Sequence, residues 1–310
     1  MSAFLRRAAA ALYDRPYLLL TLTSLFWAGN QVSGRVLATA LPAFALSFVR
    51  WGGAFFVILP FALPHLRREW PIVVRHAGIL VVLGLSSITI NAAMSYTGLS
   101  MTTAVNSLLI QSAAPLLFGL WTFILFGDRL SPHQLAGIAA SLVGVVVILC
   151  QGSLAVLLAF RPNPGDLFIF GALVVYSFYS AMLRKRPPLS TPSFLAAVIF
   201  VGWAGLVPGF WWDLHTGVPI VFTWTTGALI AYAVFLPSLI ALLFYNRGVE
   251  LVGANRAGPF FHLIPLFGSA LAIVFLGESL QPYHFAGYAL ILCGIAVATW
   301  AGRPLRRRAA

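Results

Sequence analysis

The chain has 310 residues, of which 60% are hydrophobic and only 8% are charged. Soluble domains usually carry about 25% charged residues and need polar groups to cover the surface that faces water. Seven acidic and nineteen basic side chains are too few for that surface, so the composition excludes an ordinary soluble protein and favours a lipid environment. At roughly 20 apolar residues for each spanning helix, a chain of this length holds about ten spans.

Long apolar runs follow one another along the whole chain and are separated by short turns marked by proline and glycine. The run after Tyr17 is too long for the core of a signal peptide, so we expect it to be the first span. No connecting segment is long enough to fold alone. We place the spans at residues 17–37, 43–63, 76–98, 102–126, 132–151, 165–184, 193–212, 226–248, 252–276 and 282–300.

The basic residues form short clusters between the apolar runs. A net charge of +12 can indicate nucleic-acid binding, but these clusters form no single basic face, so we expect no nucleic-acid partner. With the N-terminus inside, only Arg35, Arg50 and Arg161 of the nineteen basic residues fall on the outer side. This distribution predicts an even number of spans with both termini in the cytoplasm.

The second half of the chain repeats the first at an offset of 150 residues. Pro115 corresponds to Pro265, Gly127-Asp128 to Gly277-Glu278, and Gly137 and Gly144 to Gly287 and Gly294. Because each half holds five spans, the second half enters the membrane in the opposite orientation. We therefore predict an all-α membrane protein of ten helices, with residues 1–151 and 152–310 forming two inverted five-helix repeats in one membrane domain.

The spans show no sign of catalytic chemistry. No acidic residue lies at the predicted centre of a span, which argues against a carboxylate proton relay and an intramembrane aspartyl protease. GxSxG, HExxH and Walker motifs are absent, and Cys150 and Cys293 have no metal-binding spacing. We therefore expect no enzyme activity, no metal and no cofactor.

Polar and aromatic side chains gather in spans 1, 3, 4, 6, 8 and 9, while spans 5 and 10 have almost none. Because the segregation occurs in both halves, it predicts that these six spans line a polar cavity. For each single residue, a hydrogen bond between helices is the alternative. The candidate substrate-binding residues are Trp27, Asn30, Asn91, Ser95, Tyr96, Gln111, Tyr176, Tyr179, Tyr232, Tyr245 and His262.

Three side chains within these spans have more than one interpretation. His262 is the only histidine deep in a span, where it binds a carboxylate, carries a proton or bonds a neighbouring carbonyl. Arg35 and Arg50 either extend outward to the membrane surface or attract an anionic group, and we favour the first interpretation for both.

Three prolines lie inside predicted spans: Pro115, Pro237 and Pro265. Each removes one backbone hydrogen bond, so each acts either as a static bend or as a hinge for gating. The glycine-rich fifth and tenth spans pack either against a second copy of the chain or within a monomer, which leaves the oligomeric state open.

Motifs in both halves resemble the EamA-type family of the drug/metabolite transporter superfamily. In the first half, Trp27-Ala28-Gly29-Asn30 is similar to the family's Trp-Gly-Ser-Asn, with Ala28 in place of Gly, and Phe48-Val49-Arg50 is similar to its second-span motif. In the second half, the matching segments are Tyr245-Asn246-Arg247-Gly248, Gly253-Ala254-Asn255-Arg256-Ala257, Pro265, Leu276-Gly277-Glu278-Ser279-Leu280 and residues 287–294. The resemblance implies export of small metabolites by alternating access, and overall it points to YddG-like exporters of aromatic and other neutral amino acids.

The leading hypothesis is therefore an inner-membrane exporter of aromatic, hydrophobic and other neutral amino acids. Trp27, Tyr96, Tyr176 and Tyr179 would cover the substrate side chain, and Asn30, Asn91, Gln111 and His262 would bind its amino and carboxylate groups. The alternatives are an exporter of organic cations, a channel and a membrane-embedded enzyme. The lack of a buried acid counts against organic cations. Passive exchange and proton antiport through His262 both stay open as energy sources.

Overall fold

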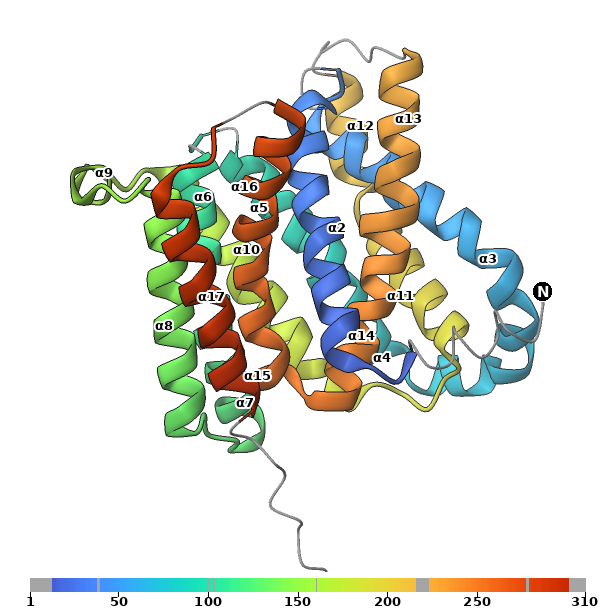
Figure 1. Cartoon of the computed structure of the whole chain (residues 1–310). Helices are drawn as coiled ribbons and strands as arrows, with labels where there is room; N and C mark the ends of the chain where they lie inside the picture. Colours follow the sequence, from blue (N-terminus) through green and yellow to red (C-terminus); the bar gives the residue numbers. More distant parts are fainter. Residues whose placement is uncertain are drawn as a thin grey trace, which may run out of the picture.

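The computed structural model describes residues 13–37, 40–99, 101–102, 104–159, 161–215, 223–276 and 279–300. Every regular element in these ranges is a helix (Figure 1). The α-helices are α2 (Pro16–Leu37), α3 (Ala43–Arg75), α4 (Ala77–Gly84), α5 (Asn91–Leu99), α6 (Ala104–Gln111), α7 (Ala114–Phe126), α8 (Pro132–Leu149), α9 (Leu154–Leu158), α10 (Pro164–Met182), α11 (Thr191–Gly205), α12 (Val207–His215), α13 (Trp224–Ala233), α14 (Ala241–Val252), α15 (Ala254–Ala257), α16 (Leu263–Leu276) and α17 (Pro282–Trp300). Two π-helices, η1 (Leu85–Ile90) and η3 (Val234–Ile240), and two 3-10 helices, η2 (Leu183–Lys185) and η4 (Gly258–His262), complete the set.

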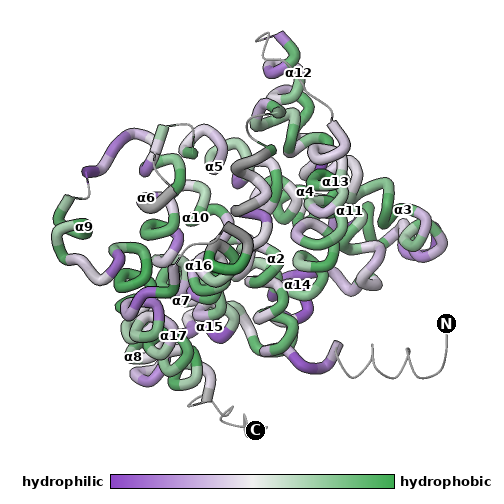
Figure 2. The backbone as a smooth tube through the Cα atoms, turned by 45° about the horizontal axis from the view of Figure 1, so that its top comes forward, coloured by the Kyte–Doolittle hydropathy of each residue, from purple (hydrophilic) through white to green (hydrophobic). Residues whose placement is uncertain are grey.

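Eight helical stretches of the described chain are long and apolar enough to cross a membrane. They are Ala43–Arg75, Ala77–Leu99, Asn106–Phe126, Pro132–Leu149, Pro164–Lys185, Thr191–His215, Trp224–Val252 and Pro282–Thr299. The predicted spans 17–37 and 252–276 are also helical, as α2 and as α15, η4 and α16, although the count of ten stays a prediction. Figure 2 shows hydrophobic residues along most of each helix, which suits a bundle whose outer surface faces lipid.

The prediction that α3 ends near Pro64 is wrong. The helix continues through Pro60, Pro64 and Pro71 to Arg75. These prolines are spaced so that all three lie on one exposed face, where the missing N–H groups and the ring bulk disturb no packing. Tertiary contact supports the extension, because the Glu69 carboxylate accepts hydrogen bonds from the backbone N–H of Ser190, at 3.1 and 3.2 Å, where α11 begins.

The two π-helices occupy equivalent positions in the repeat, because residues 85–90 correspond to 235–240. In η3, Pro237 has no N–H and cannot complete a regular helical ladder. In η1, the hydroxyls of Ser86 and Ser87 bond back to the carbonyls of Val82 and Leu83, both at 2.6 Å, which loosens the backbone in a similar way. In both halves, the regular α-helix is therefore interrupted at the equivalent position of the repeat.

A second matched pair of interruptions consists of the turn at residues 112–113 and the 3-10 helix η4, which ends at His262, the equivalent of Ser112. Leu116 N–H bonds to the Ala113 carbonyl at 3.1 Å, so the Ser112 carbonyl lacks its usual helical donor. His262 lies within hydrogen-bond distance of that carbonyl through Nε2, at 2.8 Å, and of Ser141 Oγ through Nδ1, at 2.6 Å. A fully buried imidazole thus joins the two repeat-related breaks to α8.

The fifth and tenth predicted spans, α8 and α17, lie side by side at one edge of the bundle (Figure 1). A Cβ added to Gly137 would lie 2.5 Å from the Gly294 carbonyl oxygen, and one added to Gly144 would lie 2.7 Å from that of Gly287. Only glycine permits such a close approach of two backbones. These glycines therefore allow α8 and α17 of one chain to pack closely together. Glu278 and the Arg35 side chain lie outside the described residues.

Candidate functional site

A central cavity of about 210 Å³ lies among α2, α3, η1, α5, α6, α10, η3, α14, η4 and α16. Its polar lining comes from the side chains of Asn30, Gln31, Arg50, Ser87, Asn91, Ser95, Ser107 and Gln111. Its aromatic lining comes from Trp27, Trp51, Tyr96, Tyr176 and Phe261. Elements of both halves contribute, and both π-helices reach the wall, η1 through Ser87 and η3 through Pro237.

Seven of the eleven candidate substrate-binding residues line this cavity: Trp27, Asn30, Asn91, Ser95, Tyr96, Gln111 and Tyr176. The other four lie behind the wall. Tyr179, Tyr245 and His262 are at most 1% exposed, and the Tyr232 hydroxyl donates to the Phe26 carbonyl at 3.3 Å. Of the three prolines proposed as hinges, Pro237 lines the cavity, whereas Pro115 and Pro265 are buried elsewhere.

Hydrogen bonds hold the amide side chains of the cavity in fixed positions. Asn91 donates its Nδ2 to the Ala172 carbonyl at 3.1 Å, which joins α5 to α10. Gln111 donates its Nε2 to Ser107 Oγ, one helical turn earlier, at 3.0 Å. Each amide nitrogen uses one of its two hydrogens in these bonds, so each residue can still donate one hydrogen to a ligand and accept another through its amide oxygen.

Arg50 enters the cavity wall from α3, and sequence reasoning did not include it in the site. Its Nη1 donates to Asn30 Oδ1 at 3.2 Å, and its guanidinium carbon lies 5.1 Å from the centre of the Trp51 ring. The Nε atom is buried and has no hydrogen-bond partner among the described residues. The pattern Phe48-Val49-Arg50 was visible in the sequence, but nothing in it showed that the arginine turns inward to Asn30.

Aromatic rings close one end of the central cavity. The ring of Trp27 lies 5.9 Å from Tyr176, 5.3 Å from Tyr245 and 5.4 Å from Phe261, measured between centroids. Its Nε1 donates to the Pro237 carbonyl at 3.2 Å, so the indole is anchored to η3. We call the rings of Trp27, Tyr176, Tyr179, Tyr245 and Phe261 the aromatic plug.

Hydrogen bonds between α10 and α14 hold the plug together from behind. The Tyr179 hydroxyl donates to Asn246 Oδ1 at 2.7 Å, and Ser180 Oγ lies 2.5 Å from the Tyr245 hydroxyl. All four side chains are at most 4% exposed. In contrast, the Tyr176 hydroxyl is buried at the cavity side of the plug and has no hydrogen-bond partner in the part of the chain that the structure describes.

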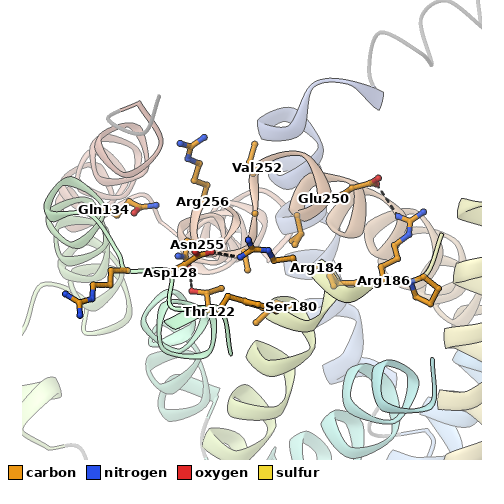
Figure 3. Close-up of a pocket in the computed structure, with 18 of the residues that line it drawn as sticks. Thr122, Asp128, Gln134, Ser180, Arg184, Arg186, Glu250, Val252, Asn255 and Arg256 are labelled. Carbon is orange, nitrogen blue, oxygen red and sulfur yellow. Dashed lines mark hydrogen bonds and ion pairs between the residues drawn. The ribbon is translucent and has the colours of Figure 1, made fainter. Parts of the chain in front are cut away.

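A second cavity of about 1010 Å³ lies beyond the plug, at the end of the bundle where α7, α10 and α14 end. Figure 3 shows its charged rim, where Arg184 pairs with Asp128 at 2.6 Å and Arg186 pairs with Glu250 at 3.1 Å. Thr122 Oγ1 also donates to Asn255 Oδ1, at 2.6 Å. Asp128, which lies between the predicted spans 102–126 and 132–151, is half exposed.

Helix α10 runs from one cavity to the other. Ile169, Ala172, Leu173 and Tyr176 line the central cavity, whereas Ser180 and Ala181 line the second. Tyr176 and Ser180 are one helical turn apart, or about 6 Å. The two cavities are therefore separated by the thickness of the aromatic plug.

The sequence model of the EamA-like transporter family matches the chain twice, at residues 15–150 and 163–300. The chain belongs to the EamA-like transporter family. The family expected from the motifs is thereby confirmed, and each half of this EamA-like transporter holds one copy of the family sequence. The narrower likeness to YddG-like exporters stays a prediction.

Other proteins are similar to this EamA-like transporter over most of its length. The uncharacterized transporter YyaM of Bacillus subtilis (strain 168) is 27% identical, over 73% of this chain and 74% of its own. A probable amino-acid metabolite efflux pump of Salmonella typhimurium is 26% identical, over 66% of this chain and 70% of its own. A protein of known crystal structure matches the fold with a TM-score of 0.76 at 22% identity, covering 94% of this chain and 99% of its own.

Family and relatives alike describe transporters, and the site of this EamA-like protein has the chemistry of a binding pocket. In the described chain, no group of three histidine, cysteine, aspartate or glutamate side chains is placed to hold a metal. The central cavity instead offers aromatic faces, amide oxygens and one guanidinium, which are groups that bind and orient a small molecule.

Proposed function

We propose that this protein exports small metabolites across the inner membrane, and that its main substrates are aromatic, hydrophobic and other neutral amino acids. The observation that carries the proposal is the central cavity, which combines an aromatic wall with polar groups from both halves. Its volume of about 210 Å³ lies below the roughly 300–1,000 Å³ of typical drug sites, which favours a single small metabolite. The Salmonella relative, named a probable amino-acid metabolite efflux pump, supports this substrate class.

The proposed mechanism is alternating access between two inverted repeats, residues 1–151 and 152–310, with ten spans and both termini in the cytoplasm. Three repeat-related features support it: the two matches to the family, the π-helices η1 and η3, and the breaks at residues 112 and 262. Matched interruptions allow each half to bend at the same level, so the halves can exchange shapes.

In this scheme the structure corresponds to an outward-facing state, with the central cavity on the outer side and the second cavity on the cytoplasmic side. The aromatic plug and the ion pairs of the second cavity then form the inner closure. To admit substrate from the cytoplasm, α10 and α14 must separate, which breaks the Tyr179–Asn246 and Ser180–Tyr245 hydrogen bonds.

The test is transport of labelled tryptophan into proteoliposomes that contain the purified protein, compared with empty liposomes. We expect saturable uptake that other neutral amino acids compete away. Replacing Ala92 in the cavity wall by Phe should fill the cavity and abolish uptake. The matched control is Ala136→Phe, on an exposed face of α8, which should transport like the unmodified protein. Equal uptake by both variants would refute the central cavity as the site.

A further inference from the structure

Among the residues that the structure describes, no carboxylate pairs with the guanidinium of Arg50. Arg50 is the eighth residue of α3, so it lies about 10 Å from the start of a membrane-length helix. A cationic side chain at such a depth is costly unless it is paired or faces a polar cavity. Arg50 lines the central cavity, and its polar contacts in the described chain are the Asn30 amide oxygen and the Trp51 ring.

The acids of the described chain bind other groups. Arg247 pairs with Asp14 and Glu250, Arg184 pairs with Asp128, Asp166 caps α10 through the Asn163 N–H, Asp213 accepts from the Ala45 N–H, and Glu69 accepts from the Ser190 N–H. None of these carboxylates lies within 4 Å of Arg50. The positive charge in the cavity is therefore left for a ligand.

The geometry of Arg50 suits a carboxylate. Asn30 accepts one proton from Nη1 at 3.2 Å and so limits rotation of the guanidinium plane. Nε is buried without a partner, which leaves it as a donor beside the remaining Nη group. Adjacent guanidinium donors form the fork that binds both oxygens of a carboxylate.

The rest of the cavity complements such a ligand. Trp27, Tyr96 and Tyr176 supply apolar ring faces, and the Tyr176 hydroxyl is a further buried donor or acceptor without a partner. We propose that Arg50, positioned by Asn30, binds the carboxylate of the transported substrate and makes the cavity selective for monocarboxylates with an apolar side group. This inference rests on the proposed function of the cavity as the transport site.

The experiment measures binding to the purified protein in detergent, with four ligands that share an indole ring. Tryptophan and indole-3-propionate carry a carboxylate, whereas tryptamine and tryptophan amide do not. We expect the two carboxylates to bind and the other two to bind at least tenfold more weakly. Arg50→Gln should weaken carboxylate binding roughly 10- to 100-fold, as expected for loss of a charge-assisted hydrogen bond, and leave the other ligands within about threefold. Arg50→Lys should retain part of the affinity.

The matched control is Arg161→Gln, which removes the same charge from an exposed connecting segment outside the cavity. It should bind like the unmodified protein. Thermal stability and gel filtration show whether each variant is folded; if Arg50→Gln is not, Arg50→Lys and Asn30→Ala provide the same comparison of ligands.

Two results for the folded Arg50→Gln variant would overturn the inference: unchanged affinity for tryptophan and indole-3-propionate, or an equal loss of affinity for all four ligands. Binding of indole-3-propionate but not of tryptophan, abolished by Arg50→Gln, would refute amino-acid export while supporting the carboxylate site. Absence of carboxylate binding by the unmodified protein would overturn the inference itself.

Discussion

The hydrogen bond between Ser180 and Tyr245 allows a direct test of the inner closure. Tyr245→Phe removes the hydroxyl that lies 2.5 Å from Ser180 Oγ and keeps the ring in the aromatic plug. Ser180 is not left unsatisfied, because its hydroxyl also donates to the Tyr176 carbonyl at 3.0 Å. The substitution should therefore destabilise the closed state by about 1 kcal/mol, the net contribution of one hydrogen bond. Once α10 and α14 separate, water replaces this bond, so the open state loses little.

A loss of about 1 kcal/mol shifts a two-state equilibrium roughly fivefold. The shift can be measured by placing a cysteine at Leu173, which lines the central cavity, in a protein whose Cys150 and Cys293 are replaced by Ala. In Tyr245→Phe, a membrane-impermeant maleimide applied from the cytoplasmic side should label this cysteine about five times faster, and labelling from the outer side should slow.

The control for this experiment is Tyr288→Phe. Its hydroxyl lies 3.1 Å from Ser269 Oγ on α16, outside the plug, so the same chemical change removes a similar bond elsewhere. Labelling rates in this variant should match those of the unmodified protein. If cytoplasmic labelling is equally slow in Tyr245→Phe, the plug does not hold the inner closure, and the reasoning fails.

Three further predictions concern the bundle itself. Gly144→Ala should reduce the free energy of unfolding by about 1–3 kcal/mol, and so lower the melting temperature, because its Cβ would lie 2.7 Å from the Gly287 carbonyl oxygen. The control Gly78→Ala places its Cβ in open space and should leave the melting temperature unchanged. Pro237→Ala restores a backbone N–H in η3. Initial rates at saturating substrate should fall, whereas the affinity for substrate should stay the same. Equal transport rates would show that the π-helix is a static bend. His262→Ala should destabilise the protein by about 1–3 kcal/mol, since it leaves the Ser112 carbonyl without its buried partner, whereas Ser141 Oγ still reaches the Gly137 carbonyl; the pH profile of transport should stay unchanged. A changed profile would instead identify His262 as a proton carrier.

The architecture was largely predictable, because apolar runs and their breakers are local properties of the chain. Ten predicted segments are helical over most of their described length, and the breaks that the structure shows at residues 112 and 262 lie at the 150-residue offset of the repeat. The end of α3 was not predictable. A proline removes one hydrogen bond from its own helix and bends it, and whether the helix still continues past Pro64 and Pro71 depends on tertiary contacts that the sequence does not show.

The π-helices were also missed, apart from the interruption at Pro237. The Ser86-Ser87 pair corresponds to residues 236–237 in the repeat, so a hydroxyl-rich segment takes the place of a proline. Ser86 and Ser87 therefore share no residue type with the two residues that occupy the equivalent positions, 236 and 237. Only the backbone hydrogen bonds of the folded chain reveal that both halves are interrupted at the same level.

The sequence by itself determined that the chain lies in a membrane, where its helices are, that its halves are related and which family it belongs to. Composition, apolar runs and the matching glycines and prolines of the two halves can be read from the order of residues, without knowing which residues meet in space. The tertiary structure alone decided which polar side chains share a cavity. Tyr245 and His262 are as polar as Asn91 and Gln111, yet the first two are buried behind the wall and the last two line it. The sequence favours an Arg50 side chain that extends toward the membrane surface, but α3 packs against α11, α12 and η3 in an orientation that brings Arg50 to Asn30 instead. Which way a side chain points depends on how helices rotate against one another, and this rotation is set by packing contacts between residues far apart in the sequence.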